Sequence, residues 1–361
     1  MASRVDLHIG LPKTATTSLQ TAIFDPRGAL ADAGIELVVD SMRELFVAAR
    51  DLGYGRGGAW GDLAEEIAET PGRVLLSCEG FAAVSPERAA GAVRDLAPAE
   101  VHVVCTLRDP ARVIPSVWQQ HVRTGALVTL PDFVERVRDG VRWTWLPDPL
   151  EVLDAWTADV PADRVKLVTV PPAGASAALV GQRFAAACEL DADLVSTVND
   201  VRNASLGPVE IEVLRLVNAG LGERRPEDGP AYRDLLRPAL RVLALHGSGS
   251  VRLGAADHAW AVSYAESLIA ALSRRGFPVY GDLDELMPTA HDAPPSGADP
   301  GAVAALAAEV AAEALLGRAQ AVSGNLERSG AEGGRGRRGG PGRRGGGRAG
   351  GGRRAQRDAP D

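Results

Sequence analysis

The sequence predicts an α/β fold in which a parallel β-sheet is covered by helices on both faces. Short runs rich in Val, Leu and Ile recur through the first half of the chain, at residues 5–9, 35–39, 73–77, 101–107 and 164–170. Stretches with helical patterning, such as 63–69 and 86–95, lie between them. Parallel strands that are buried on both faces have nearly continuous apolar sequences, and helices connect them. The alternation therefore favours a three-layer architecture.

The second half of the chain has a different sequence pattern. After about residue 205 the pattern is helical, with the clearest segments at 209–218, 232–245, 255–275 and 302–316. From about residue 323 it changes to Arg/Gly repeats that run to Arg357. Such a segment buries too little apolar surface to offset its ordering entropy. We expect one α/β domain over 1–320, with a helical C-terminal part, and a disordered tail over 323–361.

Charge divides at the same boundary. The 361-residue chain has a net charge of −8, whereas residues 333–361 contain nine Arg and two Asp, a net +7, which leaves −15 for the remainder. An acidic body argues against a globular nucleic-acid binder. The tail resembles RGG segments but has no interleaved aromatic residues. Two interpretations of it stay open: a tether for RNA or an acidic partner, or an extension without a role.

Cysteine content and hydropathy indicate the cellular compartment. The three cysteines, Cys78, Cys105 and Cys188, lie in apolar surroundings, and their odd number argues against a disulfide framework. We expect buried free thiols. No secretory leader pattern and no bilayer-length apolar run is present, and no metal-ligand spacing such as H-E-x-x-H occurs. The expectation is a cytoplasmic protein without a metal, and the scarcity of Lys relative to Arg is typical of a GC-rich bacterial genome.

The residues after the first predicted strand carry the strongest functional signal. They read Gly10-Leu11-Pro12-Lys13-Thr14-Ala15-Thr16-Thr17-Ser18-Leu19-Gln20. A strand that turns directly into a helix directs backbone N–H groups and the positive end of the helix dipole at one place. Lys13 is one of only two lysines in the chain and adds an ammonium there. The turn therefore predicts a site for a phosphate-like anion, although the second glycine of the G-x-x-x-x-G-K-[ST] loop is missing.

Two further strand ends carry candidate residues. Arg108 ends the run 101–107, and Ser116 follows eight residues later. If the segment between them turns back as a short helix, a guanidinium and a hydroxyl form a clamp for a dianion. Glu79 follows the run 73–77, where it could act as a general base on a molecule held by the first loop. The structural alternatives are a surface ion pair for Arg108, a helix cap for Ser116, and a helix cap or strand-end ion pair for Glu79.

These motifs resemble those of sulfotransferases that use 3′-phosphoadenylyl sulfate (PAPS). Pro-Lys-Thr-x-Thr-Thr-Ser resembles the 5′-phosphosulfate loop of that family, and Arg108 with Ser116 resembles its 3′-phosphate motif. The likeness covers mainly residues 5–206. It implies a P-loop-like sulfotransferase core and in-line transfer of a sulfuryl group to a hydroxyl of a carbohydrate or natural-product alcohol, without a metal.

The resemblance also implies residue roles. Glu79 takes the hydroxyl proton, and Lys13 neutralises the leaving bridging oxygen. The 3′-phosphate is held by Arg108 and Ser116. The 5′ group is held by the loop, that is by Pro12, Lys13, Thr14, Ala15, Thr16, Thr17 and Ser18. Ala15 stands where many relatives have Gly, and we expect it to adopt an ordinary helical-start conformation.

Several alternatives remain at this stage. An ATP-dependent kinase or NTPase would need an acidic Mg²⁺ ligand after a buried strand, for which Glu79 is the candidate. A non-catalytic nucleotide-binding module with an RNA-tethering tail is a third hypothesis. His121 is a second choice for the base, whereas His8 and His102 fall inside strands and are expected in the core. Arg43, Arg50 and Arg56 suggest a polar or anionic acceptor, or a solvated helix face.

Overall fold

The computed structural model describes residues 1–55, 57–141, 146–176, 178–195, 206–247, 249–289 and 297–316. The chain divides into two units, Met1–Ala311 and Ala312–Asp361. All of the fold described below belongs to the first unit. The predicted Arg/Gly tail over 323–361 lies outside the described residues.

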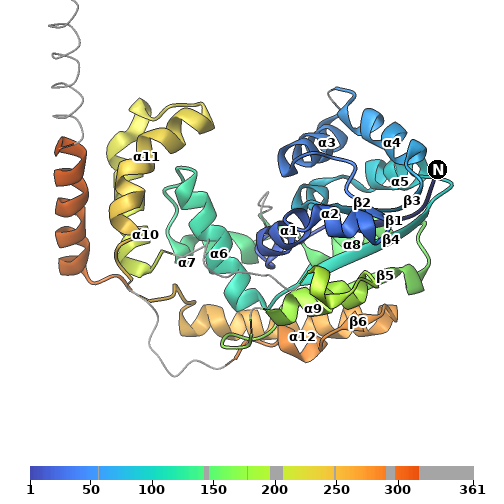
Figure 1. Ribbon diagram of the computed structural model, residues 1–361. Helices are drawn as coiled ribbons and strands as arrows, with labels where there is room; N and C mark the ends of the chain where they lie inside the picture. Colours follow the sequence, from blue (N-terminus) through green and yellow to red (C-terminus); the bar gives the residue numbers. More distant parts are fainter. Residues whose placement is uncertain are drawn as a thin grey trace, which may run out of the picture. The chain divides into compact units, whose positions relative to one another are not determined.

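The core of the first unit is a six-stranded, all-parallel sheet (Figure 1). Its strand order is β2-β3-β1-β4-β5-β6. The bounds are Ala2–His8 for β1, Ile35–Glu36 for β2, Gly72–Ser77 for β3, Glu100–Leu107 for β4, Val165–Thr169 for β5 and Val279–Tyr280 for β6. The five predicted strands are confirmed. The two residues of β6 are too short to produce a recognisable pattern and were not predicted.

The strand order positions the candidate site. The chain runs from β1 to β2 and β3 on one side, and then crosses to β4 on the other side of β1. Parallel sheets of this kind bind ligands beyond the carboxyl ends of the strands, where the strand order reverses. That place is the boundary between β1 and β4.

Helices cover both faces of the sheet, which confirms the three-layer α/β prediction. One face packs on α1, α2 and α9 through a core that includes Leu19, Leu30, Val104 and Phe184. The other face packs on α3, α4, α5, α8 and the C-terminal half of α12 through Val5, Leu7 and their neighbours. The bounds are Thr16–Phe24 (α1), Arg27–Asp32 (α2), Met42–Tyr54 (α3), Ala59–Glu69 (α4), Pro86–Asp95 (α5), Pro149–Thr157 (α8), Ala178–Ala187 (α9) and Ala255–Arg275 (α12).

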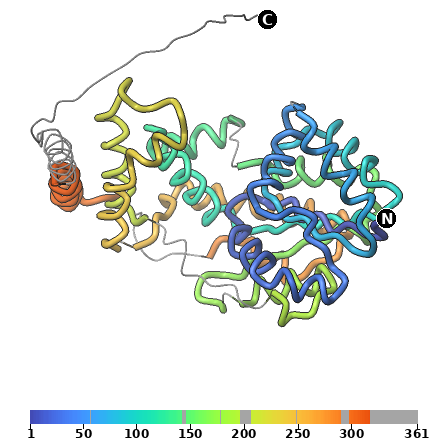
Figure 2. Tube along the Cα trace, turned by 45° about the horizontal axis from the view of Figure 1, so that its top comes forward, coloured from blue at the N-terminus to red at the C-terminus, as the bar shows by residue number. Residues whose placement is uncertain are grey.

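The remaining helices form a second hydrophobic cluster. It joins α6 (Pro110–Arg123), α7 (Leu130–Arg138), α10 (Pro208–Leu221), α11 (Gly229–Leu243), the start of α12 and the helical residues 300–311. Figure 2 shows α10 and α11, in yellow, beside α6 and α7, in green. The predicted helical C-terminal part is thus confirmed. Short 3₁₀ helices complete the first unit, namely η1 (Glu79–Ala83), η2 (Ala162–Arg164), η3 (Ala192–Leu194), η5 (Gly222–Arg224) and η6 (Leu283–Leu286).

Two expectations about individual side chains are also met. Cys78, Cys105 and Cys188 are free thiols in buried positions, and burial raises the pKa of each thiol. His8 and His102 are buried within their strands. Among the described residues, no helix combines the length and the apolarity that crossing a bilayer requires.

Candidate functional site

The loop after β1 is attached to β4 beyond the regular strand pairing. The Leu11 amide donates to the Thr106 carbonyl at 3.0 Å, and the Thr106 amide donates to the Gly10 carbonyl. The Thr14 and Thr16 hydroxyls both donate to the Leu11 carbonyl, at 2.5 and 2.9 Å. These two threonines are buried and shape the loop, whereas Thr17 is exposed and Ser18 is half-buried at the start of α1.

The backbone of this loop has two residues in the left-handed region. Lys13 has φ 66° and Ala15 has φ 67° and ψ 12°, so the expected helical-start conformation of Ala15 is wrong. Each non-glycine residue there costs about 1–2 kcal/mol. Thr14, between Lys13 and Ala15, is not in this region, and such changes of hand between neighbouring residues are typical of anion-binding nests, in which successive N–H groups face one side. No side chain caps the N-terminus of α1, so its first N–H groups remain available to an anion.

Glu79 lies directly beside the loop. Gly10 has φ +94°, and a Cβ at this position would lie 3.1 Å from the Glu79 Cα, so the two segments are in close contact. Gln20 of α1 donates from Nε2 to the Glu79 Oε2 at 2.9 Å and to the Ser77 carbonyl at 3.0 Å. This amide fixes the direction of the half-buried Glu79 carboxylate. The negative charge of Glu79 also acts on the Lys13 ammonium.

Arg108 reaches the loop from the end of β4. Its Nη1 donates to the Lys13 carbonyl at 3.0 Å. Its Nε is buried and has no hydrogen-bond partner among the described residues. Burial, and then the neighbouring Arg112, lower the pKa of Arg108 to about 10. An anionic ligand would supply the hydrogen-bond acceptor that this buried donor lacks and the negative charge that a desolvated cation favours.

A third cation comes from α6. The pKa of Lys13 is lowered first by burial and then by the charges of Arg123 and Arg108. Burial lowers the pKa of Arg123 as well. Two desolvated arginines therefore act on the desolvated Lys13 at the loop. The sequence did not identify Arg123, because it lies fifteen residues beyond Arg108 and belongs to no motif.

The placement of Ser116 differs from the geometry required by the sequence argument. The segment after Arg108 does not turn back as a short helix; α6 is a 14-residue helix that starts at the Asp109 cap. Among the described residues, Ser116 makes no hydrogen bond to Arg108. Ser116 precedes Arg123 by seven residues, so the two share one face of α6. Because Arg123 acts on Lys13, we infer that this face is turned toward the loop.

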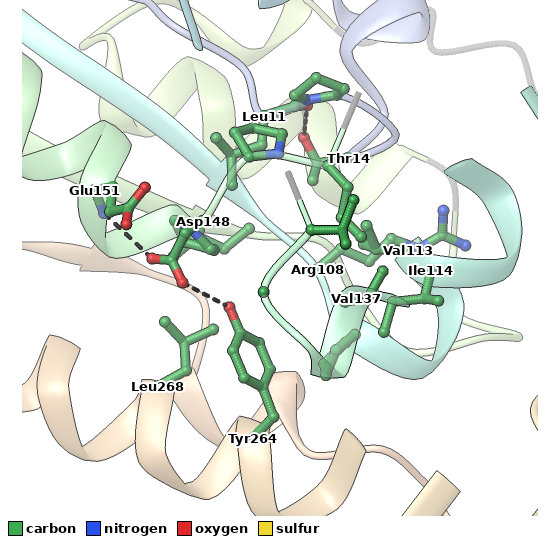
Figure 3. Close-up of a pocket in the computed structure, with 18 of the residues that line it drawn as sticks. Leu11, Thr14, Arg108, Val113, Ile114, Val137, Asp148, Glu151, Tyr264 and Leu268 are labelled. Carbon is green, nitrogen blue, oxygen red and sulfur yellow. Dashed lines mark hydrogen bonds between the residues drawn. The ribbon is translucent and has the colours of Figure 1, made fainter. Parts of the chain in front are cut away.

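A cavity of about 240 Å³ adjoins the loop (Figure 3). Pro12 and Thr14, on either side of Lys13, contribute to its wall together with Arg108. The rest of the wall is mostly apolar and comes from α6, α8, α12 and the segments around residues 137–141 and 146–149, with Pro110, Val113, Ile114, Trp260, Tyr264 and Leu268 among its residues.

The cavity has one aromatic and partly acidic side. Trp260 stacks on Tyr264, with ring centroids 5.7 Å apart. The Tyr264 hydroxyl lies 3.5 Å from the Asp148 Oδ2, a contact drawn in Figure 3. Burial, and then Asp148, raise the pKa of Tyr264. The Asp148 Oδ1 accepts hydrogen bonds from the Leu150 and Glu151 amides, which fixes the carboxylate as the cap of α8.

The other residues named by the sequence lie elsewhere. The ring of His121 packs against Phe133 of α7, at 5.7 Å between centroids. Arg43 and Arg50 are exposed on α3. Arg56 lies outside the described residues.

The fold and the site together define an α/β protein with a cationic loop at the reversal point of a parallel sheet. No family model, no curated protein and no solved structure matches this chain.

Proposed function

We propose that the protein is a PAPS-dependent sulfotransferase with a P-loop-like core. The observation that carries the proposal is the convergence of Lys13, Arg108 and Arg123 on a loop whose backbone also favours an anion. PAPS has two anionic groups, the 5′-phosphosulfate and the 3′-phosphate. Lys13 and the start of α1 would hold the first group, and Arg108 with the Ser116 face of α6 the second.

The threonine hydroxyls favour PAPS over ATP–Mg²⁺. In P-loop NTPases the hydroxyl that follows the lysine binds Mg²⁺. Here Thr14 follows Lys13, but its hydroxyl is buried and donates to the Leu11 carbonyl, and the Thr106 hydroxyl lies 2.5 Å away. This arrangement supports a nucleotide that binds without a metal.

The cavity supplies a place for the nucleoside. It shares Arg108 with the phosphate site and has apolar and aromatic walls, as pockets for flat heterocycles commonly do. Glu79 does not line this cavity, so the proposed base lies on the side of the loop away from the cavity. We therefore assign adenosine to the cavity and leave the Glu79 side for the acceptor.

The chemistry is an in-line transfer. The acceptor hydroxyl oxygen forms a bond to sulfur, while the bond between sulfur and the bridging oxygen of the 5′-phosphate breaks. Glu79, held by Gln20, takes the hydroxyl proton, and Lys13 stabilises the charge that develops on the bridging oxygen. The products are a sulfated alcohol and adenosine 3′,5′-bisphosphate. A carbohydrate or natural-product alcohol as acceptor and a cytoplasmic location belong to the same proposal.

The test is a calorimetric titration with adenosine 3′,5′-bisphosphate in the absence of metal, with ATP plus Mg²⁺ as the comparison. We expect the bisphosphate to bind, and Arg108→Ala to weaken binding roughly 10- to 150-fold, as for loss of a hydrogen bond to a charged group. Arg94→Ala, an exposed arginine on α5, is the matched control and should bind normally. Binding of ATP–Mg²⁺ alone, or an unchanged affinity in Arg108→Ala, would overturn the proposal.

A further inference from the structure

The outer face of α3 is not an ordinary solvated helix surface. Arg43, Phe46, Val47, Arg50 and Tyr54 are spaced so that they follow one side of the helix. We call these five residues the α3 stripe. Its three apolar members are 40%, 49% and 62% exposed. The opposite side of α3 already contributes Leu45, Ala48, Ala49 and Leu52 to the core, so the stripe is a second apolar surface.

The stripe begins next to the proposed base. Helix α3 packs on η1, which starts at Glu79. A Cβ at Gly80 would lie 3.7 Å from Cδ2 of Phe46 and 3.2 Å from Cβ of Ala49. Phe46 therefore borders the residue that follows Glu79. Because η1 follows β3 and Arg108 follows β4, on opposite sides of β1, the stripe is on the side of the loop away from the proposed 3′-phosphate site.

The stripe also carries two positive charges. Among the described residues, neither Arg43 nor Arg50 forms an ion pair, and the Arg50 guanidinium lies 5.9 Å from the centre of the Tyr54 ring. The neighbouring carboxylate of Glu44 is engaged at the start of α3, where it accepts hydrogen bonds from the Ser41 hydroxyl and the Asp40 amide. The stripe thus presents two cations along an apolar surface about 16 Å long, from the rise of a helix between residues 43 and 54.

We propose that the α3 stripe binds the sulfuryl acceptor, and that this acceptor is an elongated alcohol with an apolar body and an anionic group. The inference rests on the proposed function. The hydroxyl lies at Glu79, the apolar body runs along Phe46, Val47 and Tyr54, and the anion contacts Arg43 or Arg50. The acceptor oxygen forms the new bond to sulfur, its proton goes to Glu79, and the bisphosphate leaves. A neutral, hydrophilic sugar would leave both the apolar and the cationic groups of the stripe unused.

The test uses two probe alcohols with the same apolar chain, of which only one is charged. The first is 12-hydroxydodecanoate, whose hydroxyl and carboxylate are at opposite ends of an apolar chain, and the second is its methyl ester; glucose is the hydrophilic comparison. Formation of adenosine 3′,5′-bisphosphate from PAPS is followed by chromatography. We expect a lower KM for the carboxylate than for the ester, and turnover of both above that of glucose.

Variants of the stripe separate the acceptor site from the nucleotide site. Arg43→Gln with Arg50→Gln should raise the KM for the carboxylate roughly 1.4- to 5-fold, as for one exposed charge contact, and should not change the KM for the ester. The calorimetric affinity for the bisphosphate should stay unchanged. Arg237→Gln, an exposed arginine on α11, is the control and should leave both KM values as they are.

The outcomes are distinct. Normal bisphosphate binding with an unchanged carboxylate KM in the double variant overturns the acceptor inference alone. The acceptor inference is also overturned if the bisphosphate binds normally but neither probe alcohol is turned over faster than glucose. If the double variant loses only adsorption to anionic phospholipid vesicles, the stripe is a membrane surface and the inference is wrong. Absence of bisphosphate binding in the unaltered protein overturns the proposed function and this inference with it.

Discussion

The contact between Gly10 and Glu79 allows a quantitative test of the site geometry. Gly10 adopts φ +94°, and a methyl group there would lie 3.1 Å from the Glu79 Cα and 3.2 Å from its Cβ. Both atoms belong to or adjoin backbone, so they cannot move aside as the end of a long side chain can. Gly10→Ala must therefore strain the loop or displace Glu79.

The change in the free energy of unfolding caused by Gly10→Ala has three contributions. The left-handed conformation costs alanine about 1–2 kcal/mol. Overpacking against the Glu79 backbone costs about 1–3 kcal/mol. Alanine also lowers the conformational entropy of the unfolded chain, and this reduces the cost by about 0.4–1 kcal/mol. We expect a net destabilisation of about 3 kcal/mol.

Urea unfolding followed by tryptophan fluorescence measures this difference, and two other glycines serve as controls. Gly34 has φ +76° with no atom within 4 Å of a built Cβ, so Gly34→Ala isolates the conformational cost, about 1 kcal/mol. Gly28 lies in α2 with an ordinary φ and open space, and Gly28→Ala should stabilise by about 0.5–1 kcal/mol. If Gly10→Ala were no less stable than Gly34→Ala, the close approach of Glu79 to the loop would be refuted.

Three further predictions use the same structure. Asp6 is fully buried and pairs with Arg4 and Arg73, so Asp6→Asn should cost about 3 kcal/mol in urea unfolding, because it removes the only carboxylate paired with Arg73 among the described residues and one of the two paired with Arg4. Burial lowers the pKa of His8 from 6.5 to about 3, so the contribution of this group to stability is complete above pH 6.5 and is lost as the pH falls from 6.5 toward 3. Over this pH range, His8→Gln should reduce the slope of stability against pH by up to about 1.4 kcal/mol per pH unit. The lowered pKa of Lys13 means that its charge is lost at a lower pH than for an ordinary lysine, so bisphosphate affinity, measured by calorimetry, should fall as pH rises through that pKa, and Lys13→Arg should remove the dependence.

The sheet was the most predictable part of the molecule. Parallel strands covered on both faces must be apolar along their whole length, and β3, β4 and β5 lie within the runs identified at 73–77, 101–107 and 164–170, apart from a residue at an end. Short elements carry no such signal. β6 has two residues, and β2 covers only Ile35 and Glu36 of the run at 35–39. Their pairing depends on neighbours already in place.

The sequence also anticipated that Lys13, Glu79 and Arg108 meet. Each follows a strand of one parallel sheet, and the carboxyl ends of such strands share an edge. It did not anticipate the conformation of Ala15. A left-handed alanine is locally unfavourable, and the loop adopts it because contacts outside the local sequence, from Gly10 and Leu11 to Thr106, fix the chain where it enters the turn.

Arg123 illustrates why part of the site lies beyond sequence reasoning. Its position depends on the length and direction of α6, and these are set by the second hydrophobic cluster through Trp118 and Val122. Asn218 of α10 strengthens this contact, because its Nδ2 donates to the Val122 carbonyl at 2.7 Å, one residue before Arg123. The helical part of the chain therefore positions a cation at a loop that belongs to the sheet. We infer that the two hydrophobic clusters must both be formed before the anion site is complete.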